Sequence, residues 1–412
     1  MLEGRAAAVA IDAGDLSLGE GLLALLRPAL QLVESGGVVA IVSSNASVEG
    51  DLSAWCRIER HEYRGCSQVG DRVQHLIARG AMSVARGERE TGMRLSKFDA
   101  ASMLAAVPFE PRALDSSGFA PRGAQVEPGG PAYPFTLLER DRVAPLEIAE
   151  LYDQAVKSQW SAERDVPWST VKALPAALER ALGQIMTFLA ENELSALYLP
   201  SKFVSRIHPH YAEVAMFLAT QMNDEARHID VFLKRARAGG GGVGTSSVTT
   251  SQSLLSLLQL EDFTEASFLL SVLGEGTFLD LLRFIERFAP DEATHELVRR
   301  ARADETRHVH FGMAHVKHAL TNDATAFSRL EAAVRRRAAT LSTSGGVPAP
   351  IADSLVVLAA GGDDPRAIRK GYAAFRELLE TMLENRRKRL ASAGFTAEEA
   401  RIIAELHTPN FM

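Results

Sequence analysis

Cysteine is scarce in this sequence, which contains only Cys56 and Cys66 among its 412 residues. Two thiols exclude a disulfide framework and leave no cysteine-based metal site. Both cysteines are expected to pack as small apolar residues, as free cysteines commonly do. Neither is therefore expected to act as a nucleophile.

Long apolar runs are also absent. No stretch approaches the roughly 20 residues that a helix needs to cross a bilayer. The first residues, MLEGRAAAVAIDAGD, place acidic side chains where a signal peptide needs an unbroken apolar segment. The mildly acidic net charge of −7 gives no reason to expect nucleic acid or an anionic membrane as a partner. These absences predict a cytoplasmic protein.

The length predicts two or three domains. Short apolar runs alternate with leucines at helical spacing in the first part of the chain. They suit strands at 6–12, 38–43, 61–67 and 71–78, and helices at 22–33 and 47–59. This β-α-β-α-β-β order predicts a small α+β domain over residues 1–85.

The remainder is predicted to be mainly α-helical. Residues 86–140 are rich in Gly, Pro, Ser and Arg, and are expected to form a long, partly ordered linker. A nearly continuous helical pattern follows, and Gly239–Gly242 divides it into two similar halves. We expect a helical bundle over residues 141–320 and additional helices over 321–412 that pack against it.

Each half of the helical region contains nearly the same pentapeptide, DEARH at 224–228 and DETRH at 304–308. In a helix, a glutamate and a histidine three residues apart project from one face, about one turn apart. Both can therefore bind one metal ion. The two pairs are Glu225 with His228, and Glu305 with His308.

Another glutamate precedes each pentapeptide on a mostly apolar helix, Glu193 in the first half and Glu275 in the second. The separations from the motif glutamates are similar, 32 and 30 residues. Pro209 and Pro290 lie midway, so each half is expected to fold as an antiparallel hairpin with its two glutamates at similar height. Glu191 is an alternative to Glu193, which gives the better midpoint.

Two such hairpins would form a four-helix bundle with four carboxylates and two imidazoles at its centre. This is the ligand set of ferritin-like di-iron and di-manganese proteins. Burying these glutamates among apolar neighbours is costly unless they are paired or bind metal. Oxygen and imidazole ligands without thiolate suit iron or manganese. The alternative is that the pentapeptides are charged turns of surface helices, but two matched copies favour the metal site.

These motifs resemble those of the ferritin-like di-iron oxidases and oxygenases. DEARH and DETRHVHFG are most similar to the paired D-E-x-R-H motifs of bacterial multicomponent monooxygenase hydroxylases, and the resemblance covers roughly residues 145–320. It implies that Asp224 and Asp304 orient the ligand histidines. The metal ligands that it implies are Glu193, Glu225, His228, Glu275, Glu305 and His308.

Three positions depart from related families. Phe232 stands where ribonucleotide reductase small subunits usually keep a radical tyrosine, although SQWSAERDVPW (158–168) resembles a tryptophan-containing stretch of those subunits. Ala301 replaces an additional histidine ligand of the p-aminobenzoate N-oxygenases, and Leu279 replaces a threonine of the monooxygenase hydroxylases. The reaction subtype therefore stays open. Phe232, Phe278 and Leu279 are the candidates to line a substrate pocket.

The N-terminal part resembles sulfur-carrier domains of the TusA/SirA type through SSNASVEGDLSAWCRIERHEY (43–63). Those domains use a Cys-Pro-x-Pro motif at the start of the first helix. The corresponding stretch here is Leu18–Gly21, which has no thiol. The resemblance thus implies a domain without sulfur transfer, which docks a partner or packs against the bundle.

The leading hypothesis is a non-haem di-iron enzyme that uses dioxygen to oxidise or oxygenate a small organic substrate, with manganese or a mixed Mn/Fe pair as alternatives to two iron ions. An electron-donor protein is the expected partner, and a homodimer is left open. The rival hypotheses are an iron-handling protein with a ferroxidase site and a metal-containing interaction module. Other residues are expected to play no part in the site: His208, His210, His315 and His318 as solvated or polar-face residues, and Trp160 and Trp168 as packing anchors.

Overall fold

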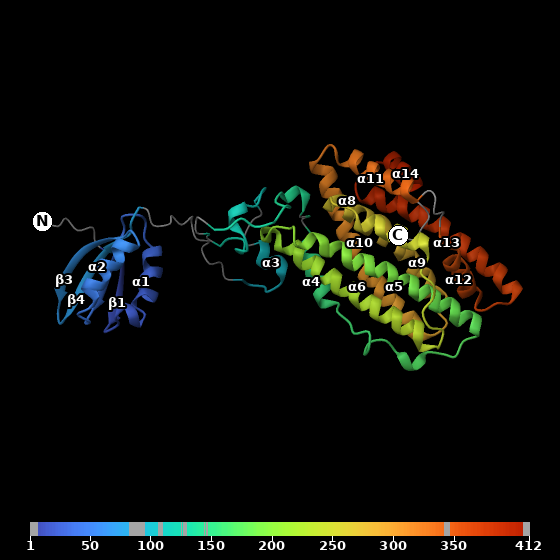
Figure 1. Ribbon diagram of the computed structural model, residues 1–412, viewed down its shortest axis with the longest axis horizontal. Coiled ribbons are helices and arrows are strands. Elements are labelled where there is room, and N and C mark those ends of the chain that lie inside the picture. Colours follow the sequence, from blue (N-terminus) through green and yellow to red (C-terminus); the bar gives the residue numbers. More distant parts are fainter. Residues whose placement is uncertain are drawn as a thin grey trace. The chain divides into compact units, whose positions relative to one another are not determined.

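The computed structural model of the chain describes residues 7–81, 95–105, 110–124, 126, 130–143, 145, 147–341 and 347–406. The chain divides into two compact units, drawn in Figure 1. The first comprises Met1–Met93 with Gly123–Gly130, and the second Arg94–Arg122 with Pro131–Met412. The described strands longer than a single bridge lie in the first unit, while long helices dominate the second, which confirms the predicted fold class. Among the described helices, none is long and apolar enough to cross a membrane.

The first unit is a four-stranded mixed sheet with two helices. Its strands follow the order β1-β2-β4-β3, with β1 parallel to β2 and β4 antiparallel to both of its neighbours. The apolar faces of the helices share a core with Val39, Ile41 and Ile77 of the sheet. The elements are β1 (Val9–Gly14), η1 (Leu18–Glu20), α1 (Leu22–Gln31), β2 (Val38–Ser43), α2 (Val48–Ile58), β3 (Glu62–Val69) and β4 (Arg72–Ala78).

The predicted order of strands and helices in this unit is confirmed, with limits that agree to within three residues. Ala6, the first residue of the predicted first strand, lies outside the described residues. Cys56 is buried in α2 as expected, and burial raises the pKa of its thiol to about 11. The expectation for Cys66 was wrong. It is exposed on β3, an edge strand of the sheet whose side chains are mostly exposed.

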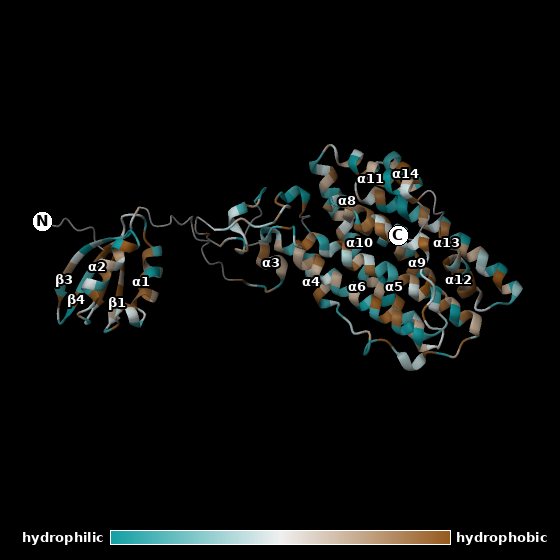
Figure 2. Cartoon of the chain, in the orientation of Figure 1, coloured by the Kyte–Doolittle hydropathy of each residue, from teal (hydrophilic) through white to brown (hydrophobic). Residues whose placement is uncertain are grey.

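The second unit is helical. Its long helices alternate hydrophilic and hydrophobic residues along their length, the pattern of helices with one buried face (Figure 2). The helices are α3 (Ala100–Ala105), α4 (Ile148–Lys157), α5 (Ala176–Val204), α6 (Ala212–Ala238), α7 (Val248–Leu258), α8 (Phe263–Ser267), the π-helix η6 (Phe268–Glu275), α9 (Gly276–Arg287), α10 (Glu292–Asn322), α11 (Ala326–Leu341), α12 (Ala349–Ala360), α13 (Pro365–Ser392) and α14 (Ala397–Leu406). Short 3-10 turns lie at η2 (Asp115–Ser117), η3 (Arg140–Arg142), η4 (Trp168–Thr170) and η5 (Pro209–Tyr211).

Two helical hairpins form the centre of this unit. Helices α5 and α6 pack against each other and are joined through a turn that contains Pro209. In the second hairpin, α8, η6 and α9 follow one another directly, and α10 returns after a turn that contains Pro290. The Asp291 side chain accepts a hydrogen bond from the backbone N–H of Thr294 and so caps α10. Both hairpins that the prolines predicted are present.

Later helices pack onto these hairpins, α12 against α5 and α13 against α9. Asp280 of α9 accepts hydrogen bonds from Arg389 Nη1 at 3.1 Å and from Asn385 Nδ2 at 2.7 Å, both on α13. The contact is close, since a Cβ atom on Gly276 would lie 2.6 Å from Arg389 Nε. The C-terminal helices therefore brace the helix that follows Glu275.

The segment predicted to be a linker is only partly described, because 86–94, 106–109, 125 and 127–129 lie outside the described residues. Two of its described parts belong to the helical unit. Arg122 forms an ion pair with Glu213 of α6, and both side chains are buried. Leu137 makes a bridge with Ile207 beyond the end of α5. These described parts of the predicted linker pack onto the first hairpin.

One buried ion-pair network fastens the hairpins to each other. The fully buried Arg235 of α6 donates to Glu179 Oε1 of α5 at 3.1 Å, and to Asp291 Oδ2 and Thr294 Oγ1 at the start of α10 at 3.1 and 2.6 Å. Breaking a buried pair leaves an uncompensated charge. Removing Arg235 should therefore be costly, because Glu179 and Asp291 would stay buried without their cation.

We expect Arg235→Met to lower the free energy of unfolding by about 3–5 kcal/mol, because two buried carboxylates lose their cation. Lys234→Met is the matched control. Lys234 pairs with the exposed Asp230, and losing that pair should cost less than about 1 kcal/mol. Urea unfolding followed by circular dichroism measures both variants. If both variants lose the same free energy of unfolding, the buried Arg235 pairs contribute no more to stability than the exposed pair of Lys234.

Candidate metal centre

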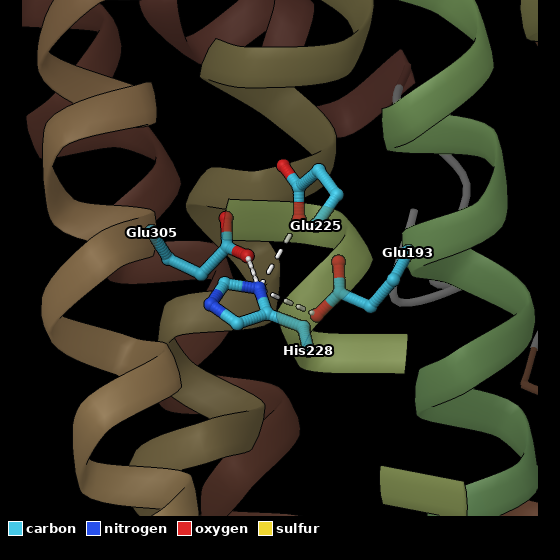
Figure 3. Close-up of side chains that lie close together, drawn as sticks. All are labelled: Glu193, Glu225, His228 and Glu305. Atoms are coloured by element: carbon cyan, nitrogen blue, oxygen red, sulfur yellow. Dashed lines mark hydrogen bonds and ion pairs between the residues drawn. The ribbon is translucent and has the colours of Figure 1, made fainter. Parts of the chain in front are cut away.

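The six residues predicted as metal ligands lie together in the centre of the helical unit. They form two overlapping groups, and the ligand atoms of each group lie within 4.8 Å of one another. Among the described residues, these are the two groups of acidic and histidine side chains whose ligand atoms lie close enough together to hold a metal ion. One group is Glu193, Glu225, His228 and Glu305, shown in Figure 3, and the other is Glu225, Glu275, Glu305 and His308.

Four separate helical segments supply these side chains. Helix α6 supplies Glu225 and His228, and α10 supplies Glu305 and His308, three residues apart in each case. Glu193 comes from α5 and is buried, whereas the alternative ligand Glu191 is half-buried and belongs to neither group. The sixth, Glu275, is the last residue of the π-helix η6. π-Helices are rare and occur frequently at functional sites.

The two histidines direct the same ring nitrogen at the glutamates. His228 Nδ1 lies 3.1 Å from Glu225 Oε2, 3.4 Å from Glu193 Oε1 and 3.3 Å from Glu305 Oε1. His308 Nδ1 lies 3.1 Å from Glu225 Oε1 and 3.4 Å from Glu305 Oε2. The two oxygens of each motif glutamate thus face different histidines. Glu225 and Glu305 therefore belong to both groups of possible ligands.

Several ligand atoms of the cluster are buried and have no hydrogen-bond partner. They are Glu193 Oε1, Glu225 Oε1, Glu275 Oε2, both oxygens of Glu305, and His308 Nδ1. None of the six residues is more than 2% exposed. Buried, unpaired carboxylates are costly, and cations placed among them would remove that cost. With neutral histidines, two divalent ions would balance four glutamate charges, so the residues present fit a dinuclear site.

The pKa shifts show the same excess of negative charge. Burial raises the pKa of Glu193 and Glu275 well above the usual range, and the charges of the neighbouring glutamates add to this. Burial opposes a charged imidazole at His228 and His308, yet the surrounding carboxylates outweigh it and raise the pKa of both. Without a metal ion, protons would therefore supply the positive charge that the cluster needs.

The other ring nitrogen of each histidine meets an aspartate from the opposite hairpin. His228 Nε2 lies 3.2 Å from Asp304 Oδ2, and His308 Nε2 lies 3.3 Å from Asp224 Oδ2. An aspartate at this position favours a proton on Nε2 and leaves the Nδ1 lone pair free for a ligand. The aspartates therefore lie where they can fix the tautomer and the orientation of both rings, as the resemblance implied.

The arginines of the pentapeptides lie beside the two aspartates that contact the histidines. Arg227 Nη2 lies 3.0 Å from Asp304 Oδ2, and Arg307 Nη2 lies 3.0 Å from Asp224 Oδ2. Each arginine also bonds the aspartate of its own pentapeptide. Two buried aspartates thus face two arginines, which balances their charge separately from the charge of the glutamates.

Sequence reasoning missed the contribution of Trp160. Its indole Nε1 donates to Asp304 Oδ2 at 2.7 Å, and the Arg227 guanidinium lies 4.8 Å from the centre of the indole ring. Trp160 is therefore a hydrogen-bond partner of the site as well as a packing residue. The resemblance of 158–168 to a stretch of the reductase subunits was the available signal. Trp168 donates to the Ala162 carbonyl and remains a packing residue.

Two of the four histidines expected to be solvated or on a polar face are buried, and the other two are half-buried. His208 is buried with the Phe135 ring against it. His315 is fully buried between aromatic rings, and burial lowers its pKa to about 4, so it stays neutral. His210 accepts a hydrogen bond from the backbone N–H of Glu110, and His318 lies 3.4 Å from Asp141. None of these histidines belongs to the metal groups.

The three residues predicted to line a substrate pocket are placed differently from one another. Phe232 is fully buried, and its ring centre lies 6.2 Å from that of His228. Phe278 is buried, and Leu279 is half-buried. A small apolar pocket with a cavity volume of about 20 Å³ lies within the helical unit, but none of these three side chains lines it.

No protein-family model matches the chain, and no curated protein matches it. Among solved structures, a variant of an R2-like ligand-binding oxidase with an aerobically reconstituted Mn/Fe cofactor is 16% identical, with a TM-score of 0.46 over 60% of this chain and 93% of that one. Another variant of an R2-like ligand-binding oxidase, with an Fe/Fe cofactor, is 17% identical, with a TM-score of 0.44 over 60% and 92% of the two chains. These values record a distant similarity. The evidence for the metal site is the arrangement of its side chains.

We expect Asp304→Asn to weaken metal binding about 10–100-fold, because the partner that orients His228 loses its charge. Asp230→Asn, on the exposed face of α6, is the control and should leave the affinity unchanged. Competition with a chelator of known affinity measures the difference. Unchanged binding by the Asp304 variant would remove this residue from the site.

Proposed function

We propose that this chain is a non-haem di-metal oxidoreductase that uses dioxygen to oxidise or oxygenate a small organic molecule. The observation that carries the proposal is the cluster of four buried glutamates and two histidines, several of whose ligand atoms have no hydrogen-bond partner. Without metal ions, the cluster can balance these carboxylates only by taking up protons on its histidines and glutamates. Iron is the first candidate, with manganese or a mixed pair as alternatives, because the donors are oxygen and imidazole nitrogen.

Each ion would have its own terminal ligands. Glu193 and His228 would hold one ion, Glu275 and His308 the other, and Glu225 and Glu305, which belong to both groups, would contribute to holding each. This assignment follows from the two oxygens of each motif glutamate, which face different histidines. When bound, the metal pair supplies the redox and Lewis-acid chemistry for dioxygen.

The protein itself contributes position, charge balance and exclusion of water. The two aspartates hold the histidine rings, and the two arginines neutralise those aspartates without drawing on the glutamates. Buried aromatic and aliphatic side chains surround the ligands, as Phe232 does beside His228. A site that is closed to water strengthens electrostatic interactions and limits side reactions. For the reducing electrons we propose a partner protein as donor.

We expect the purified protein to bind about two iron or manganese ions per chain, and Glu193→Ala to lose most of the ion beside His228. Glu191→Ala is the matched control on the same helix and should keep both ions, because Glu191 lies outside the cluster. Metal analysis gives the content, and circular dichroism checks that each variant is folded. Full metal content in the Glu193 variant, or loss in the Glu191 variant, would reverse the assignment of the first ligand.

We also expect no long-lived tyrosyl radical when the reduced, iron-loaded protein meets dioxygen. Phe232 occupies the position beside His228 and has no phenol to oxidise, while Tyr198 is 60% exposed on the outside of α5. Oxidising equivalents should then pass directly to a substrate. Electron paramagnetic resonance measures the radical, and Phe232→Tyr is the positive control that places a phenol beside the site. A strong tyrosyl signal from the unaltered protein would indicate a radical-generating function instead.

A further inference from the structure

The carboxylates of Glu193 and Glu275 are held in different ways. Glu193 Oε1 lies 3.4 Å from His228 Nδ1, the histidine of its own group. In the described part of the chain, no comparable contact joins Glu275 to His308, although the ligand atoms of their group lie within 4.8 Å of one another. The position of the Glu275 side chain therefore depends on contacts outside the ligand set.

Gln221 of α6 holds one oxygen of Glu275. Its Nε2 donates a hydrogen bond to Glu275 Oε1 at 3.0 Å, and the residue is only 1% exposed. The bond joins the two hairpins, because Gln221 lies one turn before Glu225 on α6 whereas Glu275 ends the π-helix. The other oxygen, Glu275 Oε2, is buried and has no hydrogen-bond partner. An amide thus occupies one carboxylate oxygen and leaves the second available to a cation.

The backbone around Glu275 is placed by two close approaches between helices. On α10, a Cβ atom on Gly312 would lie 2.5 Å from Ser271 Cβ, so the glycine lets the π-helix come near α10. On the other side, a Cβ atom on Gly276 would lie 2.6 Å from Arg389 Nε of α13. Packing thus fixes the backbone, but a glutamate side chain still has considerable rotamer freedom to lose. A hydrogen-bond donor can restrict that freedom before an ion arrives.

We propose that Gln221 is a positioning residue of the metal centre, which binds Glu275 Oε1 and so leaves Oε2 free for the ion beside His308. The proposal rests on the proposed di-metal function and names a residue outside the ligand set on which one of the two ions depends. Partners that fix a ligand before the ion binds contribute to metal affinity. The ion beside His228 does not depend on this amide, since Glu193 contacts His228 directly.

The test is a stepwise Mn²⁺ titration of the metal-free protein against a competing chelator, which gives a dissociation constant for each ion. Gln221→Met keeps an unbranched side chain of similar length but has no N–H donor. We expect it to weaken one constant about 10–100-fold and to leave the other unchanged. Electron paramagnetic resonance should then show isolated Mn²⁺ in the variant under conditions that give a coupled pair in the unaltered protein. Gln184→Met is the matched control on α5, where the amide bonds the Thr245 backbone, and should bind both ions normally.

A double-mutant cycle separates positioning from a general structural effect. Glu275→Ala should lose the ion beside His308. Adding Gln221→Met to it should not change the remaining constant, because the amide then has no ligand to hold. Gln221→Leu, a second side chain without a donor, should match Gln221→Met. Circular dichroism checks that each variant is folded.

Unchanged constants in the folded Gln221 variants would overturn this role of Gln221. Equal weakening of both constants, or a further loss in the Glu275→Ala background, would overturn it as well, because the amide would then act through something other than Glu275. Failure of the proposed function gives different results. An unaltered protein that binds no metal would overturn both proposals. One that binds two ions but consumes no dioxygen when reduced would contradict the oxidoreductase and leave the role of Gln221 in metal binding intact.

Discussion

Four glutamate carboxylates buried at the centre of a helical unit are the constraint on which the rest of this structure depends. Each is at most 2% exposed, and the apolar core around them offers no solvation. Such a group is stable only beside positive charge or as a neutral acid. The two histidines supply part of that charge, and ions bound between the glutamates would supply the rest. The two hairpins and the π-helix place these carboxylates close together, and Asp224 and Asp304 contact the histidines between them.

The repeated pentapeptide solves two electrostatic problems at once. Its glutamate and histidine face the centre, while its aspartate and arginine form a separate, charge-balanced layer that crosses between the hairpins. Because each aspartate binds the histidine of the other hairpin, the two halves are held in register by the same contacts that orient the ligands. This coupling gives a physical reason for the motif to occur twice with four of its five residues unchanged.

The sequence predicted the parts of the site that depend on local geometry. Spacings of three residues and the midpoint prolines located the six clustered side chains and both hairpins. Residue spacing could not predict contacts between segments that are far apart in the sequence, because those contacts depend on how the helices pack. Trp160 and Asp304 are 144 residues apart, and their hydrogen bond depends on how α10 meets the segment after α4. His315 is buried by Phe263 and Phe311, so its own helical pattern could not indicate its environment.

The ligands are nearly symmetric, but their surroundings are not, and the difference follows from the second hairpin. Glu193 lies on the α-helix α5, whereas Glu275 is the last residue of a π-helix whose residues Leu270 and Ser271 line a small pocket. Around His228, Trp160 and Phe232 fill the space. The side chains around His228 are therefore aromatic, whereas those around Glu275 include Gln221, which donates a hydrogen bond to it. The repeated motif thus fixes the ligands equally in both hairpins, while the segments outside it give the two halves of the cluster different neighbours.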